Sequence, residues 1–470
     1  MVELWERFSY YGMRALLVLF MVAPSNAGGL GFDTVEAALI YGNYTMAVYL
    51  LCIPGGYTAD HVFGARASVL YGGLIIACGH FTMAFPSHTS FFIGLVLIAL
   101  GTGLFKPSIS AMVGGLYALD DARRDGGFSI FYMGVNMGAL AAPFVTGFLA
   151  QSEIFKAWLA DFGFDPAASW HWGFAAAGIG MTVSVALFWR RVSVFGNIGG
   201  APPVPTMTLR GATAVLAGSG LLLAALLVSD QPGFEWLRYL IVGLPLAAIA
   251  LLVRRNDIEA RRVAAVFVLF IASMLFWASF EQAGLSIALF ADRLTDNHLF
   301  GFDIPSAWYQ SLNPLFVIVM APLFAVLWTR LGDRQPSTPF KFVLGLALLS
   351  ASFVLMIPAA QATVAGKVSP LWLVGLFFLQ TAGELCLSPV GLSAMTRLAP
   401  PRMVGLMLGI WFLGAAFGNK LAGLLGSGFT SDDPAGLAMF FLNLAAISAV
   451  AMLALVLLMG WLKQLMGGIR

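Results

Sequence analysis

Hydrophobic residues run along this chain in long, nearly uninterrupted segments, without the strict alternation of a half-buried strand. About 20 apolar residues are needed to cross roughly 30 Å of hydrocarbon. Fourteen segments reach that length, at residues 4–24, 35–58, 66–86, 90–118, 127–151, 170–190, 208–229, 235–254, 261–291, 305–330, 339–360, 370–397, 402–428 and 436–465. They are too long and too uniformly apolar for barrel strands. The pattern therefore predicts an all-α polytopic membrane protein with fourteen transmembrane helices.

Composition narrows the function classes. Of 470 residues, 60% are hydrophobic and 10% are charged, whereas charged residues make up about 25% of soluble chains. The net charge is +2 and no basic patch occurs, which argues against nucleic acid as a partner. The three cysteines, an odd number, exclude a fully paired disulfide framework. Glu6 and Arg7 interrupt the first apolar run, so we expect no cleaved signal peptide.

Cations in the predicted loops lie mostly on one side of the membrane. An even number of spans places both termini on the same side. Alternate loops on that side carry Arg66, Arg123, Arg124, Arg190, Arg191, Arg210, Arg254, Arg255, Arg261, Arg262, Arg330, Arg334, Lys341, Arg397, Arg402, Lys463 and Arg470. The opposite side carries Lys156, Arg238, Arg293 and Lys367. By the positive-inside rule, both termini are predicted to be cytoplasmic.

A Gly- and Pro-rich stretch at 196–205 separates the first six spans from the rest. The next two spans hold no central carboxylate or amine, whereas the groups of six on either side do. The prediction is an N-terminal six-helix bundle over 1–195, a linker with an inserted transmembrane hairpin over 196–256, and a C-terminal six-helix bundle over 257–470. Two bundles around a midplane cavity are typical of transporters that rock between two states.

The first span carries a polar stripe. Glu3, Arg7, Tyr10, Tyr11 and Arg14 recur at i, i+4, i+7, i+8 and i+11, which is one face of an α-helix. A charged side chain at the bilayer centre costs at least about 2.5 kcal/mol on insertion scales. We therefore expect this face to line a water-filled cavity.

That cavity is predicted to have two walls of opposite charge. The first bundle contributes Arg7, Arg14, Lys106 and Asn136. The second bundle contributes Glu281, Gln282, Gln310, Asn313, Glu384 and Ser388. A short zwitterion, with a carboxylate at one end and an ammonium at the other, would be oriented by such a field. The alternative is that these charges pair between the bundles and bind nothing, although desolvation makes buried ion pairs weak evidence for stability.

The same charges suggest coupling to protons. Glu3, Glu6, Arg7, Arg14, Lys106, Glu281 and Glu384 sum to three positive and four negative charges, so one proton makes the set neutral. Burial disfavours a charged carboxylate and a nearby cation favours it, so breaking an ion pair changes proton affinity. We predict Glu281 as the group that switches and Arg14 as its partner. Trp277 and Trp411 are candidates for the cavity wall, although an aromatic residue in a span more often packs.

Two motifs resemble those of the proton-coupled oligopeptide transporter family, within the major facilitator superfamily. Residues 3–11 (ELWERFSYY) fill every specified position of the family signature E-x-x-E-R-F-x-Y-Y. Residues 131–138 (FYMGVNMG) are similar to F-Y-x-x-I-N-x-G, with Val135 in place of isoleucine. Residues 56–66 resemble the superfamily loop after the second span, although His61 stands where arginine or lysine is usual. The inserted helix pair is familiar in bacterial members, so the chain is identified as a bacterial-type member.

The resemblance implies import of di- and tripeptides with protons, by alternating access, across the cytoplasmic (inner) membrane of a bacterium. It implies that the peptide carboxylate is received by Arg7 and Lys106, and that its amino end is held by Asn136, Asn313 and Glu384. It assigns the peptide backbone to Tyr11 and Tyr49, and the side-chain pocket to Trp277, Ser388 and Trp411. It assigns proton coupling to Glu3, Glu6, Arg7 and Lys106, with Glu281 and Arg14 as the pair that responds to protonation.

Other functions remain to be weighed. The same fold could carry nitrate or another small metabolite, but the complete E-x-x-E-R signature favours protons and the opposed walls favour a zwitterion. A channel or a membrane-embedded enzyme is the third possibility. No HExxH or GxSxG motif occurs, so we expect no enzyme. We expect no cofactor apart from the proton, lipid as the surrounding medium, and a monomer because one pair of bundles needs no partner.

Overall fold

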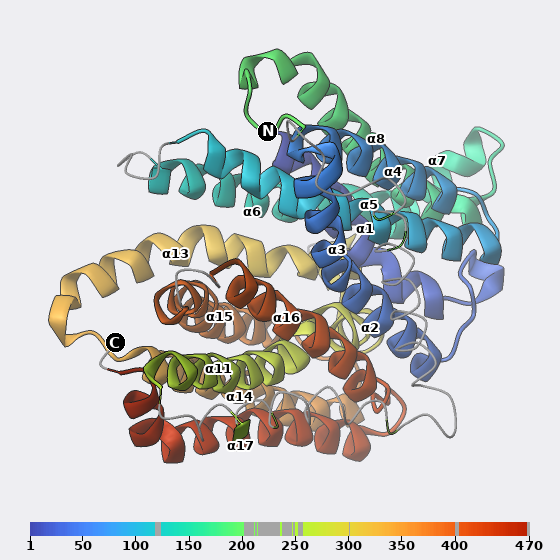
Figure 1. Cartoon of the computed structure of the whole chain (residues 1–470). Helices are drawn as coiled ribbons and strands as arrows, with labels where there is room; N and C mark the ends of the chain where they lie inside the picture. The colour runs from blue at the N-terminus through green and yellow to red at the C-terminus, as the bar shows by residue number, and fades with distance from the viewer. Residues whose placement is uncertain are drawn as a thin grey trace. The chain divides into compact units, whose positions relative to one another are not determined.

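The computed structural model describes residues 1–117, 124–201, 257–299, 301–399 and 404–467, together with the single positions 211, 214, 236, 247, 250 and 251. These residues are mostly helical (Figure 1). The chain divides into two compact units, unit 1 with residues 1–224 and 297–315, and unit 2 with residues 225–296 and 316–470. The predicted hairpin at 208–254 lies outside the described residues apart from those single positions. The hairpin and the count of fourteen spans therefore stay predictions.

Unit 1 contains α1 (Val2–Val22), α2 (Thr34–Leu50), α3 (Cys52–Thr58), α4 (Ala65–Met83), α5 (His88–Gly115), α6 (Arg124–Gln151), α7 (Glu153–Asp161) and α8 (Ser169–Arg190). α1 packs against both α6 and α8, and α4 packs along α5. A short antiparallel hairpin of β1 (His298–Leu299) and β2 (Phe302–Asp303), followed by the 3-10 helix η6 (Ser306–Ser311), also belongs to this unit.

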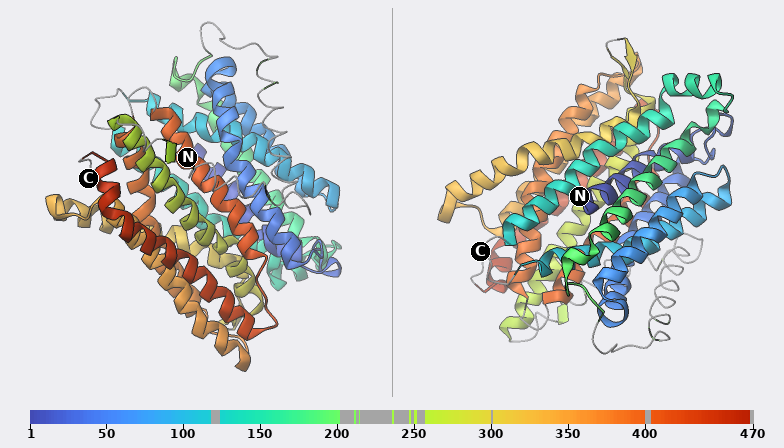
Figure 2. Two further views of the ribbon diagram at one scale, coloured as in Figure 1. Left: turned by 60° about the horizontal axis from the view of Figure 1, so that its bottom comes forward. Right: turned by 90° about the horizontal axis from the view of Figure 1, so that it is seen from above.

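Unit 2 contains α11 (Ile258–Phe280), α12 (Ser286–Arg293), α14 (Thr338–Ala362), α15 (Leu371–Leu398), α16 (Val404–Gly426), α17 (Pro434–Leu465) and all but the first turn of α13 (Leu312–Leu331). α17, in dark red, runs along α14, in orange (Figure 2). α11 packs along α16. Buried apolar side chains such as Phe270 and Met274 of α11 fill this contact.

The predicted spans that fall within the described residues are helical. Nine helical segments of that part of the chain are long and apolar enough to cross a membrane. α1 is outside this set, because it carries four charged side chains. The all-α polytopic fold predicted from hydropathy is therefore confirmed. The charged side chains of α1 set this helix apart from the nine apolar segments.

Two predicted spans depart from a regular helix. α2 ends at Leu50 and α3 begins at Cys52, but Leu51 keeps helical dihedrals and accepts from the Gly55 N–H at 3.0 Å, so the span at 35–58 is continuous with a local irregularity beside Tyr49. α11 ends at Phe280, and a 3-10 turn over Glu281–Gly284 breaks the helix before α12. Both places lie next to a predicted site residue. Broken helices are a common way for membrane transporters to bring backbone and side-chain polar groups to a binding site.

Candidate functional site

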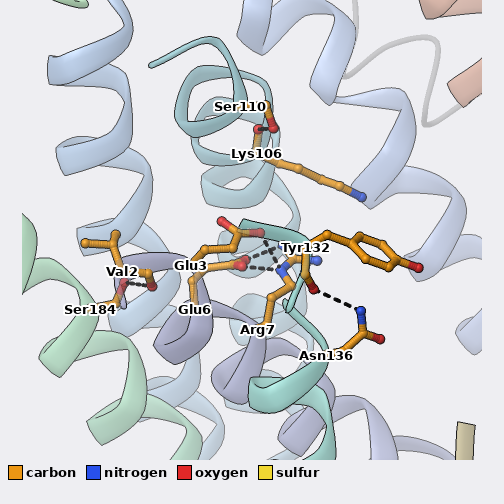
Figure 3. A network of polar contacts seen from close by, with 9 residues as sticks. All are labelled: Val2, Glu3, Glu6, Arg7, Lys106, Ser110, Tyr132, Asn136 and Ser184. Atoms are coloured by element: carbon orange, nitrogen blue, oxygen red, sulfur yellow. Dashed lines mark hydrogen bonds and ion pairs between the residues drawn. The ribbon is translucent and has the colours of Figure 1, made fainter. Parts of the chain in front are cut away.

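The start of α1 holds a buried group of three charged side chains (Figure 3). Arg7 Nε lies 3.2 Å from Glu3 Oε1, one turn earlier on the same face of the helix. The Arg7 guanidinium also donates to Glu6 through two nitrogens, Nε and Nη2, and Nη2 lies 2.6 Å from Glu6 Oε1. Glu6 is 1% exposed and Arg7 is 4% exposed. Two carboxylates on one guanidinium leave this group with a formal charge of −1.

Small residues bring α6 against this charged group. A β-carbon at Gly138 would lie 2.2 Å from the backbone oxygen of Leu4 and 3.1 Å from Arg7 Cβ, so only glycine allows this approach. About two turns further along α6, Thr146 Oγ1 donates to the backbone oxygen of Gly12 at 3.1 Å. Asn136 lies two residues before Gly138 on α6 (Figure 3). Its amide donates to the carbonyl of Tyr132 in its own helix at 2.9 Å.

Lys106 of α5 lies over an aromatic ring. Its ammonium is 3.9 Å from the ring centroid of Tyr49, within the range of a cation–π contact. A β-carbon at Gly55 would lie 2.1 Å from the carbonyl oxygen of Gly103, so α3 and α5 meet here backbone to backbone. This close approach is one turn of α5 before Lys106. Among the described residues, no carboxylate lies within ion-pair distance of the Lys106 ammonium.

Arg14 lies two turns after Arg7 on α1 and contacts tyrosines. Its Nε donates to the hydroxyl of Tyr41 at 2.7 Å. Its guanidinium carbon is 5.8 Å from the ring centroids of both Tyr41 and Tyr11. Tyr41 was not among the predicted site residues. Its position in the second span, 27 residues from Arg14, gives no sequence signal of the contact.

The charge of unit 1 differs in detail from the predicted cationic wall. Arg7 is offset by Glu3 and Glu6, whereas the Lys106 ammonium has no carboxylate within ion-pair distance among the residues that the structure describes. The Lys106 ammonium makes no contact with Glu3, Glu6 or Arg7 that is marked in Figure 3. Unit 1 therefore combines an acidic cluster with a separate cation that is available to an anionic group.

Glu281 occupies the break in unit 2. It is 4% exposed and begins the 3-10 turn after α11. The backbone at Leu285, with φ −118° and ψ −104°, departs from the helical region and ends the turn. Gln282 holds the break, because its amide donates to the Ala422 carbonyl at 2.9 Å and its oxygen accepts from Ser286 at 2.8 Å. Gln282 was predicted to face the cavity, but it is fully buried in this contact with α16.

Glu384 and Ser388 lie one turn apart on α15, and both are half-buried. Trp411 of α16 is 5% exposed. It packs so closely on α15 that a β-carbon at Gly391 would lie 2.0 Å from its ring. Trp277 of α11 makes edge contacts with Phe276 and Phe280. Both tryptophans are thus part of the helix packing of unit 2, and their role in a side-chain pocket stays a prediction.

Asn313 lies at the start of α13, in the segment 297–315 that groups with unit 1. The sequence placed it with the second bundle. The difference arises because η6 is hydrogen-bonded to α6: Ser311 Oγ donates to the Leu140 carbonyl at 2.8 Å, and Gln151 Nε2 donates to Ser306 Oγ at 2.8 Å. Arg14 and Glu281 belong to different units, so their predicted pairing stays a prediction.

Metal binding finds no support in the described part of the chain, where no group of three His, Cys, Asp or Glu side chains could hold an ion. Glycines were the functional residues that sequence analysis missed. Gly103 and Gly138 set the distance of Lys106 and Asn136 from their neighbours. The position of Gly138 at the end of the F-Y-x-x-x-N-x-G motif was the available signal.

Comparison with known proteins gives concordant results. The profile of the POT family matches residues 66–435. The peptide transporter YePEPT of Yersinia enterocolitica is 38% identical, over 99% of this chain and 93% of that protein. A di-/tripeptide transporter of Lactococcus lactis subsp. cremoris is 38% identical, over 87% of this chain and 84% of that protein. A crystal structure of a mutant peptide transporter POT in complex with alafosfalin has a TM-score of 0.86 at 37% identity, covering 99% and 94% of the two chains.

Proposed function

This chain belongs to the POT family, and we propose that it imports di- and tripeptides together with protons by alternating access. Proton-coupled symport is the general property of that family, and relatives that align with nearly the whole chain are peptide transporters by name. A symporter requires a substrate site and a protonatable group whose states depend on each other. The two units supply candidates for both.

The observation that carries the proposal is the environment of Lys106. A membrane-embedded ammonium that has an aromatic ring but no carboxylate beside it is a costly arrangement, unless an anion joins it during function. The carboxylate of a short peptide is such an anion. Lys106 would bind it together with Arg7, whose own carboxylate partners Glu3 and Glu6 would then share the guanidinium with the substrate.

The remaining peptide contacts follow from the family resemblance. Asn136, Asn313 and Glu384 would hold the amino end, and Tyr11 and Tyr49 would contact the backbone. Ser388, Trp277 and Trp411 would shape the side-chain pocket. The half-buried positions of Glu384 and Ser388, one turn apart on α15, are compatible with such roles.

Proton coupling would use two places. The first is the Glu3–Glu6–Arg7 group of α1, where binding of the peptide carboxylate to Arg7 would favour protonation of a released glutamate. The second is Glu281, in the turn between α11 and α12. The surroundings of a carboxylate at a break in a helix change when the two halves move. Protonation of Glu281 would therefore be coupled to movement within unit 2, and Arg14 would be its ion-pair partner.

The surroundings of the protein follow from its charges. Because most loop cations fall on one side, both termini would lie in the cytoplasm and the chain would reside in the cytoplasmic membrane of a bacterium. The protein would act as a monomer in lipid, with the proton as coupling ion and no other cofactor.

The test is uptake of radiolabelled dialanine into proteoliposomes under an imposed pH gradient. We expect saturable accumulation that collapses when a protonophore removes the gradient. Nitrate offered in excess should not compete. Flux that does not saturate and does not depend on the gradient would indicate a channel, and competition by nitrate without competition by peptides would indicate another cargo.

A further inference from the structure

Two cations at one end of unit 2 have no part in the proposed peptide site. Lys341 lies in the first turns of α14 and Arg397 in the last turn of α15, and α13 ends beside them, with Trp328 near its end. These helix ends surround a pocket of about 490 Å³, whose polar lining includes Gln335, Thr338, Lys341, Ser393 and Arg397. All the lining residues belong to unit 2.

Lys341 is the buried cation of this pocket, with only 8% of its surface exposed. Its ammonium donates to Gln335 Oε1 at 2.8 Å and lies 4.4 Å from the ring centroid of Trp328. Arg397 donates to Thr338 Oγ1 at 3.4 Å. These partners are neutral, and no described residue that lines the pocket carries a carboxylate. Two positive charges therefore face one space, and none of the described lining residues offsets them with a negative charge.

The beginning of α14 adds to the positive potential. α14 starts at Thr338, its N-cap residue Ser337 makes no side-chain cap hydrogen bond, and Pro339 at its second position has no N–H, so the first turn offers fewer donors than usual. The first N–H groups of a helix and its dipole favour an anion at this position. A lysine, an arginine and an uncapped helix start around one cavity form the donor set that proteins use for phosphate groups. We propose that this pocket is a binding site for a phosphate group.

Phosphate could come from solution or from a lipid headgroup, and the surface of the surrounding helices bears on the choice. Leu327, Phe340 and Leu392 are exposed, and each is next in sequence to a residue of the pocket lining. The helices that form the pocket therefore also present apolar side chains at their surface, which suits the acyl chains of a phospholipid. Basic pockets between helices on the cytoplasmic side bind anionic headgroups, and this pocket lies on that side if the proposed orientation holds.

The experiment compares the full-length protein in neutral detergent with the double variant Lys341→Gln/Arg397→Gln. The matched control, Arg330→Gln/Lys463→Gln, removes the same charge from two exposed residues that do not line the pocket. Phosphatidylglycerol, phosphatidylcholine and inorganic phosphate are titrated separately. Binding is read from the rise in Tm, since a ligand of the folded state stabilises it by mass action, and from lipid adducts in native mass spectrometry.

We expect phosphatidylglycerol to raise Tm and to form adducts, and phosphatidylcholine to do neither. The affinity for phosphatidylglycerol should fall at least about tenfold in the double variant and stay unchanged in the control. Stabilisation by inorganic phosphate without any by phosphatidylglycerol would assign the same pocket to a soluble phosphate. Equal binding by wild type and double variant, or equal loss in the control, would overturn the site. If the double variant does not fold, Arg397→Gln alone decides, because that side chain is exposed.

Discussion

At the scale of single residues, Lys106 is the side chain on which the substrate proposal depends most. We predict that Lys106→Gln, which keeps the length of the side chain nearly unchanged, abolishes or severely reduces dialanine uptake. Buried hydrogen bonds to charged groups contribute roughly 1.5–3 kcal/mol, so peptide binding should weaken by about 10- to 150-fold. The measurement is KM and kcat for proton-driven uptake in proteoliposomes.

Tyr49→Phe is the companion substitution, because it keeps the ring beneath the Lys106 ammonium and removes the hydroxyl, the group that we propose contacts the peptide backbone. We expect Tyr49→Phe to lose less affinity than Lys106→Gln, since an uncharged hydrogen bond contributes only about 0.5–1.5 kcal/mol. Uptake by Lys106→Gln at the wild-type level would remove Lys106 from the site, whatever the effect of Tyr49→Phe.

Glu281 is the residue on which the coupling proposal depends. We predict that Glu281→Gln still exchanges labelled for unlabelled peptide between equal pools but no longer accumulates peptide against its gradient. Glutamine fills the same space in the turn after α11 and cannot take up or release the coupling proton. Counterflow and gradient-driven uptake are measured on the same vesicles. Equal loss in both assays would place Glu281 in peptide binding and not in coupling.

The sequence singled out the charged residues of α1 as candidates but did not predict their partners. Charged side chains in an apolar span are conspicuous because they are costly in lipid, so Glu3, Glu6 and Arg7 could be recognised, and their burial together is what the structure adds. The sequence could not tell which carboxylate binds Arg7, because Glu6 at i−1 and Glu3 at i−4 are both within reach. In the structure, both carboxylates bind it. The contact of Arg14 with Tyr41 depends on two helices meeting, which local sequence does not encode.

At the scale of helices, the hydropathy pattern was sufficient to place the spans, because hydrocarbon requires about 20 apolar residues in any crossing helix. It was not sufficient to find the break after Phe280. Glu281 and Gln282 are polar, but polar residues also occur inside continuous helices of this chain, and the break is stabilised by Gln282, which donates to the Ala422 carbonyl 140 positions away. Breaks of this kind depend on tertiary contacts.

The contact between α1 and α6 yields a prediction that removes no functional group. At Gly138, a methyl group would lie 2.2 Å from the Leu4 carbonyl oxygen, and overpacking of this kind costs about 1–3 kcal/mol. We predict that Gly138→Ala lowers the apparent Tm and reduces uptake, because it pushes Asn136 and the start of α1 apart. Thermal unfolding in detergent and uptake in vesicles measure the two effects.

Gly134→Ala supplies the control on the same helix, since a β-carbon there meets nothing within 4 Å. It should leave Tm unchanged or raise it slightly, because alanine favours the helix over glycine by up to about 1 kcal/mol. If both alanine variants behave alike, the close approach of α6 to α1 is not what the substitution disturbs.

At the scale of the whole molecule, the chain passes between the two units within α13. The segment 297–315 groups with unit 1, and the rest of α13 groups with unit 2. Sequence analysis assigned everything after residue 257 to one bundle, because a boundary inside a helix leaves no linker composition to detect. Side chains of α6 hold the segment 297–315 to unit 1. Gln151 is one of them: its Nε2 donates to Ser306 Oγ, and its Oε1 accepts from the Ala307 N–H.

This arrangement bears on alternating access. One helix cannot stay fixed to two bodies that rock against each other unless it bends. We therefore predict that the contact of residues 306–311 with α6 opens during each transport cycle. A β-carbon at Gly147 would lie 3.0 Å from Ala307 Cβ, a little nearer than the roughly 3.5–4.5 Å of disulfides. The pair Gly147→Cys/Ala307→Cys should therefore form a disulfide after a small adjustment.

In a background with Cys52, Cys78 and Cys386 replaced by serine, we expect oxidation of this pair to stop dialanine uptake and reduction to restore it. The single-cysteine variants, treated in the same way, should be insensitive to oxidant, which excludes damage elsewhere. Full transport by the cross-linked protein, with disulfide formation verified by mass spectrometry, would mean that the segment remains on α6 throughout the cycle. α13 itself would then have to bend, and Pro322 inside it would be the position to examine next, because proline removes a helix hydrogen bond.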